Sequence, residues 1–195
     1  NKPKFAPVDE NAPDNRGDIY ATNQGWVRAA GTKGSGNDNV NAQPEVLVAI
    51  GGLAGTSATT GLRTPTITRT RFVVGTTANT DFTANDANAQ IDVEITFDEQ
   101  VTVTGSPQLT VTNNDASGGG YGNLTLAYIS GESTANQLRF RKTSAGIGNT
   151  DVLTVSTLAL NGGTIRDTAA AAAGNTVNAT LTYASGIAVS KTVSS

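Results

Sequence analysis

The chain has 195 residues, a formal net charge of −3, and neither cysteine nor histidine. Its 13 basic residues are scattered, which argues against a nucleic-acid partner because phosphate binding needs clustered Lys and Arg. The lack of histidine removes the commonest general base and the commonest transition-metal ligand, and the lack of cysteine excludes disulfides. No apolar run reaches the roughly 20 residues that are needed to span a bilayer.

Residues 1–63 are predicted to form an N-terminal arm with one short strand. Three prolines lie among polar residues in the first 13 positions, so this opening cannot form a helix and has little apolar surface to bury. The run 45–50 is a plausible strand, although it is too continuously apolar for a lone solvated edge. A Gly- and Thr-rich linker then leads into residues 64–195.

Two interpretations of the arm are open. In the first, it folds back on the rest of the chain or forms a small subdomain. In the second, it is extended and buries its apolar residues on another chain, because removing apolar surface from water is favourable by roughly 25 cal/mol per Å² and a strand can complete a partner's sheet. The second interpretation makes these residues the candidate contacts with a partner: Tyr20, Trp26, Val27, Val46, Leu47, Val48 and Ile50.

Residues 64–195 are predicted to form an antiparallel β-sandwich. Apolar and polar residues alternate strictly in 91–98, so the apolar ones line one face of a strand, while Asp92 and Glu94 share the other face, which we expect to be solvated. Strands separated by turn formers about every ten residues are typical of this fold. The other predicted strands are 66–74, 101–103, 108–112, 123–128, 137–141, 152–155 and 179–183.

An ordered set of motifs in this region carries a resemblance. ITFDEQVTVTGSPQLTV at 95–111 is followed by LAYISGESTANQLRFR, LNGGTIRD and GN…ATLTY. Together they resemble the bacterial immunoglobulin-like repeats of large surface adhesins, which implies an all-β, immunoglobulin-like sandwich over about residues 66–189. The pattern departs from those repeats at 169–173, and it occurs once, whereas adhesins carry such units in tandem.

The arm carries a second resemblance. YATNQGWVRAAGTKGSG…PEVLVAIGGLAG at 20–55 resembles the N-terminal segment of head-associated structural proteins of tailed bacteriophages. With the sandwich, this implies a virion structural protein: a decoration (cement) protein on the outer capsid surface, whose arm grips the major capsid protein. We also expect self-association at capsid symmetry axes, with a trimer as the first guess. The alternative is an immunoglobulin-like module of an adhesin on the bacterial cell surface.

One predicted loop carries candidate binding residues. The Gly-rich stretch 113–123 is expected to be a hairpin tip, and it is no phosphate loop because it lacks the following Lys-Ser/Thr and helix. Tyr121 on this tip can stack against a sugar ring. A lone loop tyrosine is more often only part of its loop. The alternative is a weak contact with host-surface glycans through a host-facing tip that includes Asp115, Tyr121 and Asn123.

Other polar motifs receive a structural interpretation. The tripeptide 16–18 spells the integrin-recognition sequence, but Gly-Asp in a Pro- and Asn-rich segment is ordinary turn chemistry. No pair of acids marks a hydrolytic cleft, so we expect no catalytic residue and no cofactor. A calcium ion needs six to eight oxygen ligands, and such a site would require these acids to meet at one pole of the sandwich: Asp98, Glu99, Asp151 and Asp167.

Overall fold

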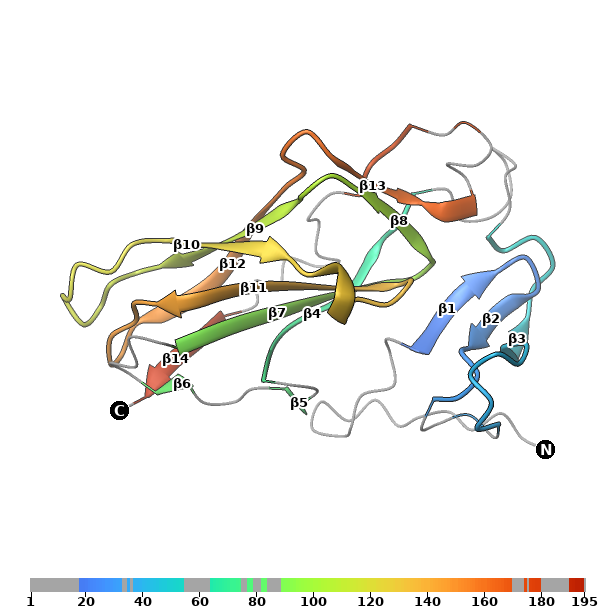
Figure 1. The fold of residues 1–195 in the computed structure, drawn as a ribbon, viewed down its shortest axis with the longest axis horizontal. Coiled ribbons are helices and arrows are strands. Elements are labelled where there is room, and N and C mark those ends of the chain that lie inside the picture. The colour runs from blue at the N-terminus through green and yellow to red at the C-terminus, as the bar shows by residue number, and fades with distance from the viewer. Residues whose placement is uncertain are drawn as a thin grey trace.

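A computed structural model describes residues 18–32, 35, 37–54, 64–74, 77–78, 82–83, 89–169, 174, 176–179 and 190–194. Nearly all regular structure in these ranges is β, which confirms the all-β prediction (Figure 1). A single turn of 3₁₀ helix, η2 (Ser130–Glu132), precedes β11. None of the helical turns in the described ranges is long and apolar enough to cross a membrane.

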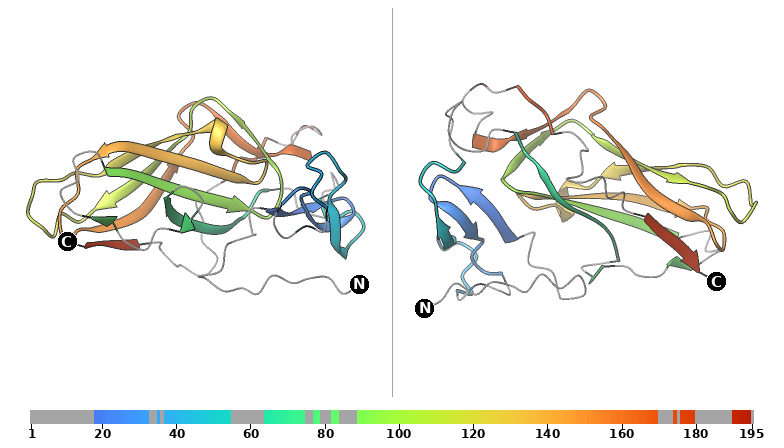
Figure 2. Two further views of the ribbon diagram at one scale, coloured as in Figure 1. Left: turned by 60° about the horizontal axis from the view of Figure 1, so that its bottom comes forward. Right: turned by 180° about the vertical axis from the view of Figure 1, so that it is seen from behind.

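The larger part of the chain is one long sheet that folds over on itself as a sandwich. Its order is β5-β4-β7-β11-β10-β9-β12-β14-β6, and its neighbours are antiparallel except for β14 and β6. Figure 2 shows β7 and β11 in one layer and β12 and β14 in the other. Its strands are β4 (Ile67–Val74), β5 (Thr77–Ala78), β6 (Phe82–Thr83), β7 (Ala89–Phe97), β9 (Gln108–Asn113), β10 (Leu124–Tyr128), β11 (Gln137–Ala145), β12 (Val152–Ala159) and β14 (Ser190–Ser194).

The core lies between the two layers. The inward residues of β7 predicted from the alternation are fully buried, and apolar residues of β9, β10, β11 and β12 pack against them. A separate two-stranded sheet, β8 (Val101–Thr104) with β13 (Thr164–Asp167), adds Val101 and Ile165 to the same core. The predicted strands from 66 to 155 are confirmed, and the strand predicted at 179–183 lies almost wholly outside the described residues.

The expectation of a solvated outer face on β7 is wrong. Asp92 and Glu94 are only 0% and 5% exposed. Arg71 on β4 and Arg139 on β11 lie directly opposite Glu94 in the two neighbouring registers, and both form ion pairs with it, the first at 2.6 Å. Glu94 is therefore buried because arginines on both neighbouring strands neutralise it.

The same network extends toward the edge of this layer. Arg141 binds both oxygens of Asp92 in a bidentate pair, with Nε–Oδ1 at 2.8 Å and Nη2–Oδ2 at 2.7 Å. Glu132 on η2 forms ion pairs with both arginines, with Oε2 at 3.0 Å from Nη1 of Arg139 and Oε1 at 2.6 Å from Nη1 of Arg141. Positive and negative side chains thus alternate across three adjacent strands, and one 3₁₀ turn covers them.

The described part of the N-terminal segment forms a small antiparallel sheet of order β1-β2-β3. Its strands are β1 (Ile19–Thr22), β2 (Gly25–Arg28) and β3 (Glu45–Ala49). Only β3 was predicted, because the residues of β1 and β2 do not alternate between apolar and polar. A two-residue connection closes them into a hairpin. Gly25 has a φ of 121°, and a Cβ there would collide with the Val48 carbonyl oxygen, so β3 can pair beside this position only with glycine present.

This N-terminal sheet, residues 19–49, rests on one end of the sandwich (Figure 1). The N–H of Ala21 donates to the carbonyl of Asp98 at 2.8 Å, and Nδ2 of Asn136 donates to the carbonyl of Ile19 at 3.1 Å. Ala21 also forms a parallel bridge with Glu99. Strand β1 is therefore held by its own sandwich, which agrees with the first of the two interpretations of the arm, in which it folds back on the chain or forms a small subdomain.

Candidate functional site

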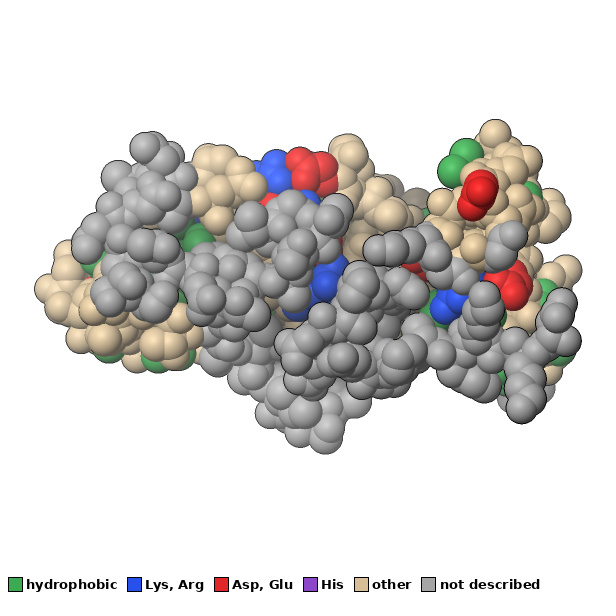
Figure 3. Space-filling model, turned by 90° about the horizontal axis from the view of Figure 1, so that it is seen from below, with side chains coloured by type: hydrophobic (Ala, Val, Ile, Leu, Met, Phe, Trp, Pro, Cys, Tyr) green, Lys and Arg blue, Asp and Glu red, His purple; other side chains and the backbone are tan. Residues whose placement is uncertain are grey.

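Strand β3 is exposed although its side chains are apolar. Val46 and Val48 on the strand and Ile50 just after it are 43%, 40% and 42% exposed. Within the described residues β3 pairs with β2 alone, so its other edge meets no described strand. An edge strand of this kind is a template for pairing with another chain. Figure 3 shows hydrophobic side chains on the surface of the end that carries this sheet.

The candidate contact residues divide between the two sides of the N-terminal sheet. Tyr20 and Val27 are 8% and 1% exposed and lie opposite each other in the β1–β2 register. The Tyr20 hydroxyl hydrogen bonds to Gln100 of the sandwich, so this pair belongs to the internal junction and not to a surface that a partner can reach. The reachable candidates are Trp26 and Leu47, both half-buried, with Val46, Val48 and Ile50.

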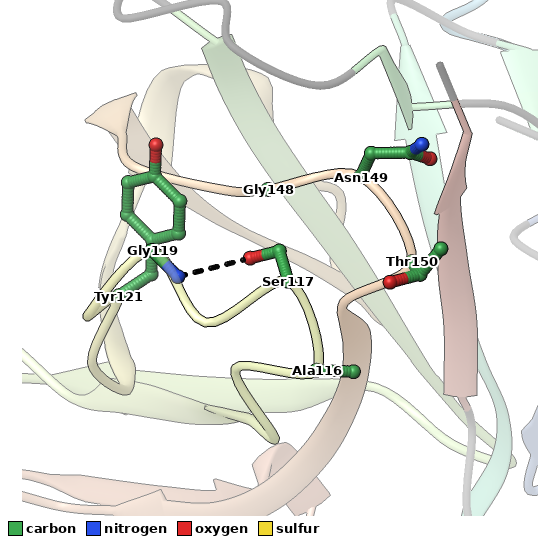
Figure 4. A pocket seen from close by; sticks show the side chains of 7 residues that line it. All are labelled: Ala116, Ser117, Gly119, Tyr121, Gly148, Asn149 and Thr150. Carbon is green, nitrogen blue, oxygen red and sulfur yellow. Dashed lines mark hydrogen bonds between the residues drawn. The ribbon is translucent and has the colours of Figure 1, made fainter.

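A pocket of about 430 Å³ (Figure 4) lies between two loops at the end of the sandwich away from the N-terminal sheet (Figure 1). The β9–β10 loop, the hairpin tip that the sequence predicted, supplies one wall, and the β11–β12 loop supplies the other. The described lining residues are all uncharged. They are Ala116, Ser117, Gly119, Tyr121, Gly148, Asn149 and Thr150.

Asp115 organises the Gly-rich wall of this pocket from within. Its carboxylate accepts hydrogen bonds from the backbone N–H groups of Gly120 at 3.0 Å and Tyr121 at 3.1 Å. Asn123 has a similar local role, since its Oδ1 accepts from the N–H of Asn113 at 3.1 Å. Of the three predicted host-facing residues, Tyr121 alone lines the pocket, and the other two shape the loop.

Asp151 ties the two walls together. It is fully buried, and its carboxylate accepts from the N–H of Ser117 at 2.9 Å, the N–H of Gly148 at 2.8 Å and Nδ2 of Asn113 at 2.9 Å. Burial alone would raise the pKa of Asp151, but these hydrogen bonds outweigh it and lower the pKa to about 2. The side chain is thus an ionised hub that fixes the spacing of both loops.

The four acids that a calcium site would require do not meet. Asp98, Glu99 and Asp167 gather beside the N-terminal sheet, whereas Asp151 lies at the other end with the pocket loops. Within the described ranges no group of three or more acidic side chains is arranged to hold a metal ion. The three gathered acids form a buried acidic cluster at the junction between sheet and sandwich.

Glu99 is the most perturbed member of this cluster. It is 1% exposed, and in the described part of the chain neither carboxylate oxygen has a hydrogen-bond partner. Burial raises its pKa to about 8, and the charges of Asp167 and Asp98 add to that rise. Burial also raises the pKa of Asp98, against the opposing effect of a hydrogen bond from the N–H of Thr66 at 2.9 Å. Glu99 is therefore largely protonated at neutral pH.

No family model, curated protein or solved structure matches this chain. Function must therefore be argued from two surfaces, the exposed edge of β3 and the loop pocket. Sequence reasoning identified Val46–Ile50 and Tyr121 but missed Ser117, Asn149 and Thr150 as pocket residues. The missing signal is spatial, because the second wall comes from a loop about thirty residues further along the chain and becomes a neighbour only when β9 and β12 pair.

Proposed function

We propose that this protein is a non-enzymatic decoration protein of a tailed-bacteriophage head, which docks on the major capsid protein through the outer edge of β3. The observation that carries the proposal is the exposure of Val46, Val48 and Ile50 on and beside a strand whose outer edge pairs with no other described strand. A single chain gains nothing from leaving these side chains in water. The resemblance of residues 20–55 to head-associated phage proteins supplies the class of partner.

The energetics favour a lattice as the partner. Fully burying a Val or Ile side chain contributes about 1.5–3 kcal/mol, so covering the exposed two-fifths of three such side chains contributes about 2–4 kcal/mol. Backbone pairing along β3 would add to this. Such a contact is modest for one site, but a capsid presents it many times, and a ligand that binds only the assembled lattice stabilises that lattice by mass action.

The arrangement of the molecule suits this function. The N-terminal sheet lies at one end of the long axis, and the β9–β10 loop lies at the other (Figure 1). A protein docked through β3 would thus project its sandwich away from the capsid. Self-association into a trimer remains part of the proposal, with the capsid symmetry axes as the places where copies would meet.

The second candidate is a module of a bacterial surface adhesin. One observation favours it: the N-terminal sheet and the last described strand, β14, lie toward opposite ends of the molecule (Figure 1), as in chains that carry domains end to end. In that case the edge of β3 would meet the preceding module of the same protein instead of a capsid.

Co-sedimentation with empty capsids of the phage that encodes the chain tests the proposal. The full chain is expected to sediment with capsids, and the variant Val46→Lys/Val48→Lys is expected to stay in solution. The matched control is Thr125→Lys/Ala127→Lys, which changes two exposed residues with the same spacing on β10. Equal binding by the β3 variant would contradict docking through β3. Absence of binding by the unmodified chain would contradict the decoration function itself.

A further inference from the structure

We propose that the pocket between the β9–β10 and β11–β12 loops binds a neutral sugar, with the ring of Tyr121 as a stacking surface and the hydroxyl groups of Ser117 and Thr150 as hydrogen-bonding partners. This site lies at the end of the molecule opposite to β3 and does not depend on the proposed docking (Figure 1). The sequence indicated a glycan contact at Tyr121 only. The structure adds the β11–β12 loop as the second wall of the site and an uncharged described lining.

The chemistry of the lining selects among ligand classes. The described lining has one aromatic ring, hydroxyl groups and no charged side chain. It suits a ligand with apolar C–H faces and several hydroxyls, because a hydroxyl can both donate and accept. An anion is disfavoured since the N–H groups of the Gly-rich loop are already used: Gly120 and Tyr121 donate to Asp115, and Gly119 donates to Oγ of Ser117 at 3.4 Å. A cation is disfavoured because no carboxylate lines the described walls.

The aromatic ring is held in place by glycines. A Cβ on Gly146 would lie 2.8 Å from Cδ1 of Tyr121, and a Cβ on Gly148 would lie 3.0 Å from its Cε2. A Cβ on Gly119 would collide with the same ring. Three glycines from two loops therefore let the ring rest directly on backbone, while its half-buried state leaves part of it open. A ring fixed before binding loses little freedom when a ligand stacks on it.

Thr150 supplies an independent observation. Its φ is 72°, in the left-handed region that costs a β-branched residue free energy and that Gly or Asn adopts with less strain. The N–H of Thr150 donates a hydrogen bond to the carbonyl of Val193 on β14 at 2.9 Å, and this bond fixes the strained conformation. In Figure 4 the Thr150 hydroxyl points to the side where Ser117 lies, whereas the Asn149 amide points away from Tyr121. The strained backbone thus places the Thr150 hydroxyl on the pocket wall, where a bound sugar would form a hydrogen bond with it.

Nuclear magnetic resonance of the full chain tests this site. The probes are D-glucose, D-galactose, D-mannose and N-acetyl-D-glucosamine, with inorganic phosphate as the anionic probe. We expect at least one sugar to give saturable shifts confined to the backbone amides of 116–121 and 148–150, and phosphate to give none. Tyr121→Leu and Thr150→Gly should each weaken binding by about tenfold, the size expected for one lost stacking or hydrogen-bonding partner. Thr125→Ala, on an exposed strand position, should leave binding unchanged.

Several results would overturn the proposal. They are the absence of saturable shifts with all four sugars, shifts that map elsewhere, phosphate binding at the same amides, or unchanged binding in Thr150→Gly. Tyr121→Phe guards against a folding defect in Tyr121→Leu, since it keeps the ring on its glycines and should retain most of the affinity. The variant Val46→Lys/Val48→Lys should bind sugar like the unmodified chain, so failure of the capsid experiment and failure of this one are distinguishable.

Discussion

The carboxylate of Asp151 accepts a hydrogen bond from the backbone N–H of Ser117 at 2.9 Å, and so joins two loops that are 34 residues apart in sequence. The same carboxylate also accepts from Asn113 and Gly148. Because the two loops are the walls of the pocket, the shape of the pocket depends on one buried, ionised side chain.

Replacement of Asp151 should therefore destabilise the protein. Asp151→Ala leaves two backbone N–H groups and one amide without their acceptor, which should lower the free energy of unfolding by about 2–3 kcal/mol in urea denaturation at pH 7. Asp38→Ala, at an exposed position, is the control and should change it little. Equal stability of the two variants would show that the hub is dispensable.

The same carboxylate should make stability depend on acid. Its pKa is about 2 in the folded protein against an ordinary 3.8, so it contributes stability above pH 3.8 that is lost as the pH falls toward 2. Asp151→Asn cannot titrate, and it should therefore show a flatter decline than the unmodified chain in this window. Thermal melting at pH 5, 4, 3 and 2 measures the difference, and parallel curves would contradict the assignment.

Glu99 should show the opposite dependence. Its pKa is raised from 4.5 to about 8, so between these values the folded chain retains a proton that the unfolded chain has lost, and stability falls as the pH rises through the window. Glu99→Gln removes this cost and should raise the free energy of unfolding by about 1–3 kcal/mol at pH 9, with a smaller gain at pH 5. Glu45→Gln, on exposed β3, should be neutral at both values. An equal loss of stability at pH 5 and pH 9 in Glu99→Gln would contradict the conclusion that Glu99 is a neutral buried acid.

The sequence predicted the fold where local alternation was enough. The residues 91–98 identified β7 and its inner face, because side-chain period along one strand is a local property. The outer face was misjudged because Arg71 and Arg139, which lie 23 and 45 residues from Glu94, become its neighbours only through strand register. No local pattern encodes which strands pair.

The pocket shows the same limit. Tyr121 could be named from the sequence because the alternating strands on both sides of it predicted the hairpin tip on which it lies. Thr150 could not, since its importance arises from a positive φ and from the loop opposite, neither of which the residue type indicates. The N-terminal hairpin was missed because buried and exposed positions do not alternate along β1 and β2, and the contact of Ala21 with the sandwich is again non-local.

The buried charge network predicts a large effect at Arg139. Its side chain pairs with Glu94 and Glu132 and lies 3.7 Å from Asp92. Arg139→Met leaves buried acids with fewer partners, so it should lower the free energy of unfolding by about 2–4 kcal/mol. Arg139→Lys keeps the charge but cannot form the same fork of hydrogen bonds, and its loss should be intermediate. Lys142→Met, on the same strand, is the control, and a loss as large as that of Arg139→Met would mean that the network is not the cause.

Thr150→Gly should separate stability from binding. Relief of strain at a φ of 72° is worth about 1–2 kcal/mol for a β-branched residue, and the added freedom of glycine in the unfolded chain costs about 0.5–1 kcal/mol. The free energy of unfolding should thus stay level or rise by up to about 1.5 kcal/mol. The matched control is Thr125→Gly on strand β10, which has no such strain to relieve and should lose about 1 kcal/mol. Urea denaturation measures both variants. A loss at Thr150 as large as that at Thr125 would mean that the threonine is retained for the fold, because strain kept for a ligand should disappear without harm when the residue is replaced.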